Sequence, residues 1–141
     1  LIGPEAEAQA TILHGAEAVL TVSESEVPWS TVMIRKSFGV AAAAHYGPEG
    51  YVLAWPSAES GPLPLEGGVA VAFKKEISEA QNPEAKRKEI EESMAKHQSP
   101  FPRAESFSVH EIVDPRETRK YLCLWAERIQ PQLKAKVLHL K

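Results

Sequence analysis

The first hydrophobic stretch of the chain has the spacing of a helix. Its apolar residues recur at steps of three and four, which places them on one face: Ile12, Leu13, Ala16, Val19 and Leu20. Pro4 suits the first position of a helix, and Glu5 and Glu7 follow where the helix dipole favours negative charge. We therefore predict a first helix that begins near Pro4 and fades after residue 20.

Short apolar runs bounded by proline predict strands. Residues 30–34 form a β-branched run after Pro28, and residues 51–55 form a second run that Pro56 stops. Residues 109–113 make a third, strand-like edge. Between the first two runs, Phe38, Gly39 and Val40 predict a turn, and the alanines that follow it predict a short helix. Residues 59–65 contain two prolines, so we expect an extended or looped segment there and not a central strand.

The second half of the chain is mainly helical by pattern. Residues 66–77 fit a helix begun by Gly67 and Gly68, and Asn82 with Pro83 is a strong start for the next one. That helix, residues 84–98, is charged nearly all round, with pairs such as Lys88 and Glu92, so we expect it to pack only a thin stripe. A last helix begins at residues 114–117.

The alternation of strands and helices predicts the α/β class. Within it, we predict that residues 30–34 and 51–55 share one sheet, with the first and last helices packed outside it. We expect Trp55, before Pro56, and Trp125, in the last helix, to serve as core or interface anchors.

Composition and charge narrow the function classes. The chain has 141 residues, 43% of them hydrophobic and 25% charged, which is ordinary for one globular domain or part of one. Its formal net charge of -3 argues against binding to nucleic acid or membrane surfaces through bulk charge. No apolar run approaches the roughly 18 residues of a membrane span, and no signal peptide is evident, so we expect a cytoplasmic protein. Because a helix start follows Leu1 at once, we also expect the chain to be part of something longer.

Reactive side chains are scattered. The five histidines have no partners at the spacing of a metal site, so we expect no metal. Cys123 lies within an apolar helical face, where a buried structural thiol is the usual case, and a single cysteine forms no internal disulfide. No nucleophile elbow, phosphate-binding loop or dinucleotide fingerprint occurs.

The turn at Gly39 is the one place where the sequence indicates a possible catalytic site. A glycine between a strand and a helix allows an unusual backbone conformation, and the N–H groups of the first helical turn point outward. Such groups stabilise an oxyanion as its charge develops. The alternative is a plain tight turn whose alanines allow close helix packing.

The same residues resemble a known family. Residues 32–42, V-M-I-R-K-S-F-G-V-A-A, are similar to the V-I-V-R-K-A-Y-G-G-A-Y run of the carboxyltransferase (β) subunits of biotin-dependent acyl-CoA carboxylases, such as propionyl-CoA and acetyl-CoA carboxylase. Residues 54–76 match, without gaps, the family run that begins A-W-P-T-A-E. Residues 2–7 with 14–16, and residues 109–119 with their D-P-R-E-T-R, supply two further blocks in the right order.

The resemblance implies a crotonase-like α/β fold of repeated β-β-α units, with residues 1–141 as the C-terminal part of a carboxyltransferase domain. It implies transfer of a carboxyl group from carboxybiotin to the alpha carbon of an acyl-CoA, with this chain on the biotin side. The oxyanion hole would use the backbone N–H groups of Gly39, Val40 and Ala41, and biotin would contact Phe38, Gly39 and Ala42. No side-chain acid or base is needed.

The resemblance also implies partners. Biotin would be carried by a partner protein or domain, alongside a biotin carboxylase subunit, and the acyl-CoA would bind an N-terminal half, in a homo-oligomer or as a complementary chain. Some residues depart from the family pattern: Val40 replaces its second glycine, Ala42 replaces a tyrosine, and Pro62 and Pro64 interrupt an expected strand. Val40 and the two prolines leave a second hypothesis open beside the carboxyltransferase, a non-catalytic crotonase-fold module for binding or assembly.

Overall fold

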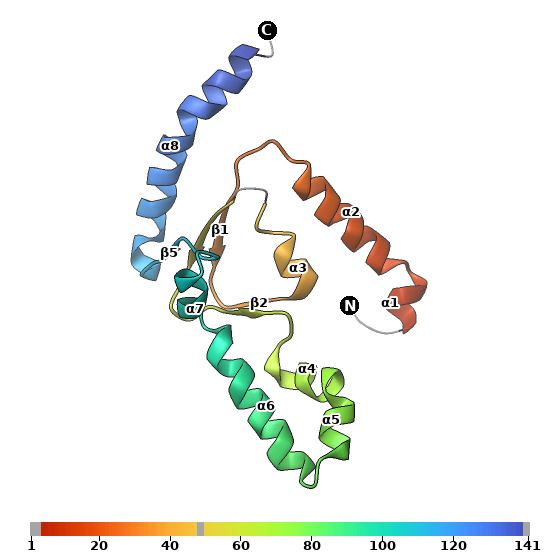
Figure 1. Ribbon diagram of the computed structural model, residues 1–141. Helices are drawn as coiled ribbons and strands as arrows, with labels where there is room; N and C mark the ends of the chain where they lie inside the picture. The colour runs from red at the N-terminus through yellow and green to blue at the C-terminus, as the bar shows by residue number, and fades with distance from the viewer. Residues whose placement is uncertain (1–3, 48–49, 140–141) are drawn as a thin grey trace.

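The computed structural model describes residues 4–47 and 50–139 (Figure 1). In chain order its elements are α1 (Pro4–Ala8), α2 (Thr11–Ser23), β1 (Ser30–Met33), β2 (Lys36–Phe38), α3 (Gly39–Ala43), β3 (Tyr51–Ala54), β4 (Glu59–Gly61), α4 (Leu65–Ala72), α5 (Lys74–Glu79), α6 (Pro83–Gln98), α7 (Pro100–Glu105), β5 (Glu111–Ile112), a 3₁₀ turn (Pro115–Glu117) and α8 (Thr118–His139).

Two parallel sheets organise the described chain. The first has the order β1-β3-β5, and Ser30 to Met33 pair in register with Tyr51 to Ala54. The second sheet pairs β2 with β4, so that Phe38 lies opposite Gly61. The prediction that residues 30–34 and 51–55 share a sheet is confirmed. Each is followed by a strand of the second sheet and then by a helix, which makes two β-β-α units side by side.

The buried core lies on the first sheet. Its cluster consists of Met33, Val52, Ala54, Ala58 and Val109, with Tyr46, Ala104 and Ile112 packed against it. Leu53 is also fully buried. Because β3 is the central strand, its residues from Val52 to Ala54 are all buried.

Several elements differ from the sequence pattern at their ends. The first helix is two helices, because Ala10 adopts a left-handed conformation with φ 55° between α1 and α2. The helix expected over 66–77 is also two, divided at Phe73, and Glu66 and Gly67 are not helical. Residues 36–38 form a strand that the pattern did not predict. Residues 59–61 are a short strand that ends before Pro62, as the prolines require.

The charged helix α6 agrees with its prediction. The Asn82 side chain accepts a hydrogen bond from the N–H of Ala85 at 3.1 Å, which caps the helix start. Lys88 and Glu92 lie 3.8 Å apart as an ion pair one turn apart. With α4 and α5, which pack against it, α6 forms a helical arm that extends away from both sheets (Figure 1).

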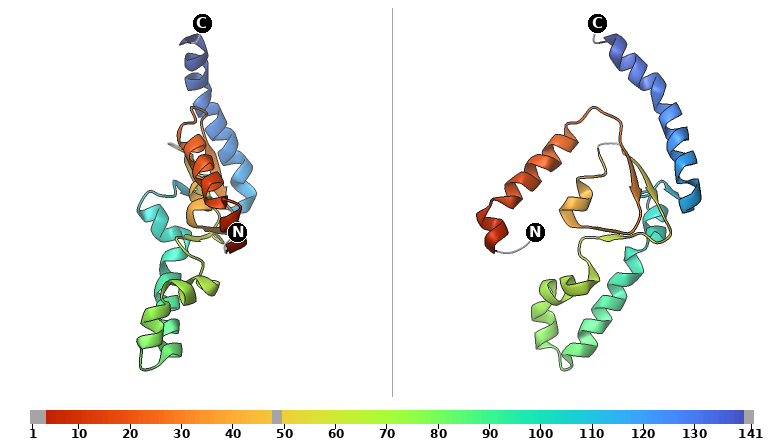
Figure 2. Two further views of the ribbon diagram at one scale, coloured as in Figure 1. Left: turned by 90° about the vertical axis from the view of Figure 1, so that its right-hand side faces the viewer. Right: turned by 180° about the vertical axis from the view of Figure 1, so that it is seen from behind.

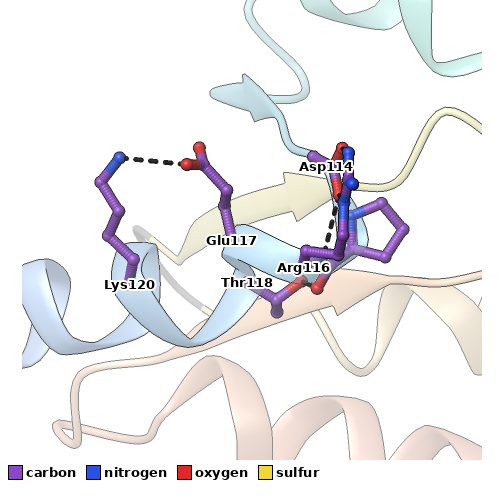
Figure 3. A network of polar contacts seen from close by, with 6 residues as sticks. Asp114, Arg116, Glu117, Thr118 and Lys120 are labelled. Carbon is purple, nitrogen blue, oxygen red and sulfur yellow. Dashed lines mark hydrogen bonds and ion pairs between the residues drawn. The ribbon is translucent and has the colours of Figure 1, made fainter.

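The D-P-R-E-T-R block is the start of α8 (Figure 3). Asp114 accepts a hydrogen bond from the backbone N–H of Arg116 at 2.9 Å and pairs with its guanidinium at 2.6 Å. These contacts lower the pKa of the Asp114 carboxyl, and the hydrogen bond from the Arg116 guanidinium is the largest cause. The indole N–H of Trp55 donates to the Thr118 hydroxyl at 2.9 Å, which joins the end of β3 to the new helix.

Helices α2 and α8 lie on the outside but point largely away from the sheets (Figure 2). Trp55 and Trp125 are both half-buried. The expectation of a buried Cys123 is wrong: its side chain is exposed, because the described residues do not cover that part of α8. No helix of the described residues is long and apolar enough to cross a membrane.

Candidate functional site

The turn from β2 into α3 has the conformation that its glycine makes possible. Phe38 is extended, with φ -125° and ψ 147°, and Gly39 then adopts φ 70°. In that left-handed region a side chain is strained against the backbone, so glycine is favoured. The chain enters α3 at Gly39 itself, two residues before the alanine run begins.

The turn places backbone donors at the start of α3. Val40 and Ala41 occupy the first turn, where N–H groups have no acceptor within the helix. The N–H of Ala44 bonds the carbonyl of Val40 at 3.0 Å, which continues the helical pattern beyond this first turn. Such a group of donors is suited to an oxygen that carries negative charge.

The turn is open to an approaching ligand. Val40 is 69% exposed, and Ala41 is also exposed, while Phe38 and Ala42 are half-buried. A Cβ placed on Gly39 would have only the Pro62 carbonyl oxygen nearby, at 3.7 Å. The five predicted site residues are consecutive in the chain, and none of them is fully buried.

A hydrogen-bonded pair supports the turn from behind. The Ser37 hydroxyl lies 3.2 Å from the Tyr46 hydroxyl, and Tyr46 also donates to the sulfur of Met33 at 3.4 Å. These contacts join the end of β1, the strand β2 and the segment after α3. The backbone donors therefore rest on a fixed frame, which preorganised charge stabilisation requires.

A second loop lies beside the first, and the sequence reasoning missed it. Lys36 on β2 forms an ion pair of 2.9 Å with Glu66, which precedes Gly67 at the irregular start of α4. Gly67 has φ 81°, so this loop also depends on a glycine. The hydrogen bond from Lys36 is the main cause that lowers the pKa of Glu66. The two residues are thirty positions apart, and no local pattern signals their contact.

No metal site accompanies the turn. Among residues 4–47 and 50–139, no group of three His, Cys, Asp or Glu side chains is placed to hold a metal ion. Phe38 and Ala42, the apolar neighbours of the turn, are half-buried.

Comparison with known proteins agrees with this architecture. The chain is 37% identical over 124 residues to the methylmalonyl-CoA carboxyltransferase 12S subunit of Propionibacterium freudenreichii subsp. shermanii, covering 85% of the chain and 24% of that protein. The crystal structure of a transcarboxylase 12S hexamer with methylmalonyl-coenzyme A and methylmalonic acid bound superposes with a TM-score of 0.76 at 34% identity. It covers 92% of this chain and 26% of that one.

A more distant structure shows the same fold. The β subunit of P. aeruginosa geranyl-CoA carboxylase superposes with a TM-score of 0.81 at 21% identity, over 90% of this chain and 25% of that one. The crotonase-like α/β fold is confirmed by these neighbours. The chain spans about a quarter of the length of the relatives it matches. The family model described as the carboxyl transferase domain matches residues 1–136, so the chain belongs to the carboxyl transferase domain family.

Proposed function

We propose that residues 1–141 form the C-terminal part of a carboxyltransferase domain and contribute the biotin side of its active site. The whole protein would transfer a carboxyl group from carboxybiotin to the alpha carbon of an acyl-CoA. Membership of the family supports this reaction class. The observation that carries the assignment to this chain is the exposed turn at Gly39, with its left-handed backbone directly at the start of α3.

The residues of the turn fit biotin. Its bicyclic ring needs an opening with apolar sides and donors for the ureido oxygen. Phe38 and Ala42 supply half-buried apolar surface, and Gly39 leaves space in front of the backbone. Carried on a partner protein or domain, biotin would supply the carboxyl group. The acyl-CoA would bind a complementary N-terminal half, and a biotin carboxylase subunit would load the carrier.

The contribution of this chain is electrostatic. Backbone N–H groups of Gly39, Val40 and Ala41 would donate to an oxygen that gains negative charge during transfer. Because the donors are fixed by the frame of Ser37, Tyr46 and the strand β2, little reorganisation is needed when the charge develops. No side chain of the turn acts as an acid or a base, so the donors stabilise charge and the half-buried apolar flanks exclude water.

The departures from the family pattern do not favour the non-catalytic alternative. Val40 is 69% exposed, so the described residues do not pack its side chain into the turn. The prolines at 62 and 64 follow the end of β4 and do not interrupt its pairing with β2. The pairing that places Phe38 before the turn is therefore intact, and the catalytic assignment is the better supported of the two.

Removing one donor tests the assignment. Ala41→Pro deletes an N–H that has no acceptor within α3, and in the first helical turn proline is tolerated. In the intact protein we expect carboxyl transfer to fall by about 10²–10³-fold. The control Ser57→Ala removes an exposed hydroxyl that donates to the Ile34 carbonyl, outside the turn and its supporting pair, so transfer should change much less. Thermal melts establish that both variants fold. A folded Ala41→Pro variant with near-normal transfer would show that the turn is only a packing feature.

A further inference from the structure

A second candidate site lies on the arm side of β4. A cleft of about 490 Å³ opens between the end of β4 and the helices α6 and α7, within the usual size range for small-molecule sites. Ser60 and Pro62 come from the strand end, Met94, His97 and Gln98 from α6, and Arg103 from α7. We propose that this cleft binds a compact organic anion, with a carboxylate or phosphate group held by Arg103.

The charge of the cleft selects an anion. Its lining contains Arg103 and His97 and no Asp or Glu, although the whole chain has nineteen acidic residues and a net charge of -3. Within the described residues the Arg103 guanidinium has no carboxylate partner. An unpaired guanidinium presents a planar set of donors that matches a carboxylate or phosphate. The Nδ1 of His97 lies 3.0 Å from the Ser93 carbonyl, and its Nε2 takes no part in that contact.

Polar groups are built into the floor of the cleft. Ser60 is 1% exposed, and its hydroxyl has no hydrogen-bond partner among the described residues. Gln98 is 5% exposed and is fixed by a hydrogen bond from its side-chain amide to the Leu63 carbonyl at 2.9 Å. A buried hydroxyl without a partner is unfavourable in the fold and needs an explanation. A polar ligand in the adjoining cleft provides one.

The rim of the cleft is strained. Ser106 and Ser108 both line it, with their hydroxyls 3.2 Å apart. Phe107 between them has φ 57°, although it is a bulky residue, and its side chain is 86% exposed. Burial of the ring therefore does not compensate for the strain. Strained backbone of this kind concentrates at ligand sites, where it places neighbouring groups.

The apolar part of the lining defines the rest of the ligand. Met94, Pro62 and Pro102 line the cleft together with the polar groups. A short hydrocarbon chain attached to the anionic group would pack against them, and the flexible methionine adapts to such a body. The proposal does not depend on carboxyl transfer, because none of these residues belongs to the Gly39 turn.

Isothermal titration calorimetry on the intact protein tests the site with hexanoate and inorganic phosphate as separate probes. We expect at least one of them to bind, and Arg103→Gln to weaken that binding by about tenfold or more, because hydrogen bonds to a charged group are lost. The matched control is Lys96→Gln, which removes the same charge from an exposed position of α6 outside the cleft. It should leave binding within about twofold.

Each outcome bears on the proposal. Binding of hexanoate alone identifies a carboxylate with an apolar body, and binding of phosphate alone identifies a phosphate ligand. Failure of both probes overturns the proposal, as does an equal loss in Lys96→Gln. Substitution of Arg103 leaves its structural contacts intact, since its backbone carbonyl makes them. If the variant still misfolds, Ser60→Ala replaces it: we expect weaker binding with an unchanged or higher melting temperature. Unchanged binding there would also overturn the proposal.

Discussion

One residue with a left-handed backbone lies at each of the two candidate sites, the Gly39 turn and the cleft beside β4. Gly39 adopts φ 70° at the candidate carboxyl transfer site, where glycine pays no steric penalty. Phe107 adopts φ 57° at the rim of the cleft, where a side chain is strained. The same region of conformational space is thus reached without strain at one surface and with strain at the other, and only the second leaves room for a stabilising substitution.

Phe107→Gly should therefore raise stability. Relief of the left-handed strain is worth roughly 1–2 kcal/mol, and the added flexibility of glycine in the unfolded chain offsets about 0.5–1 of it. Since the side chain is 86% exposed, little buried area is lost. We expect a net gain of about 0.5–1 kcal/mol in the free energy of unfolding, measured from the denaturation midpoint. Phe101→Gly within α7 is the control and should destabilise, because glycine is unfavourable in a helix. A lower midpoint for Phe107→Gly would contradict this account.

At the scale of elements, the Lys36–Glu66 ion pair holds β2 beside the start of α4. The hydrogen bond from Lys36 holds the pKa of Glu66 below its ordinary value of 4.5. A carboxyl with a lowered pKa in the folded state stabilises the fold above its unfolded pKa, and this contribution is lost as the pH falls through the folded value. The stabilisation from the Lys36–Glu66 ion pair should therefore be lost only at acidic pH, as Glu66 becomes protonated.

An NMR titration of the Glu66 side chain measures this link. In the unaltered protein we expect its titration midpoint below 4.5, and in Lys36→Met we expect it to move up toward that value. Lys75→Met is the control, because Lys75 pairs with Glu79 on α5 and does not contact Glu66. An unshifted midpoint in Lys36→Met would show that the ion pair does not form in solution.

Local signals account for the elements that the sequence predicted. The proline-bounded runs of β1 and β3 and the Asn82 cap of α6 are encoded within a few residues, and the structure confirms them. The special conformation at Gly39 was also predicted, since only a glycine stands between strand and helix there. The strand β2 has three residues and pairs with β4 across the chain, so its formation depends on a distant partner. The Lys36–Glu66 contact and the cleft likewise bring together residues that are far apart in the sequence, so no short sequence pattern predicts them.

At the scale of the whole molecule, apolar surface remains uncovered. Large hydrophobic side chains of α2 are open to solvent, with Ile12 78%, Leu13 67% and Leu20 56% exposed. In α4, Val71 is 80% exposed. Apolar patches of this kind mark surfaces that contact other protein. The chain spans about a quarter of its relatives' length, so further protein in the same domain or a second copy is the natural cover.

We therefore expect this chain, when produced by itself, to associate. Light scattering at high concentration should show species larger than a 15.5 kDa monomer. Leu13→Glu places a charge in the exposed apolar stripe of α2 and should reduce association, because a buried carboxylate without a partner is strongly unfavourable. His14→Glu introduces the same carboxylate at the next position, outside that stripe, and should reduce it less. A monodisperse monomer of the unaltered chain would contradict the expectation, and equal effects of both substitutions would show that net charge, and not the apolar face of α2, governs the association.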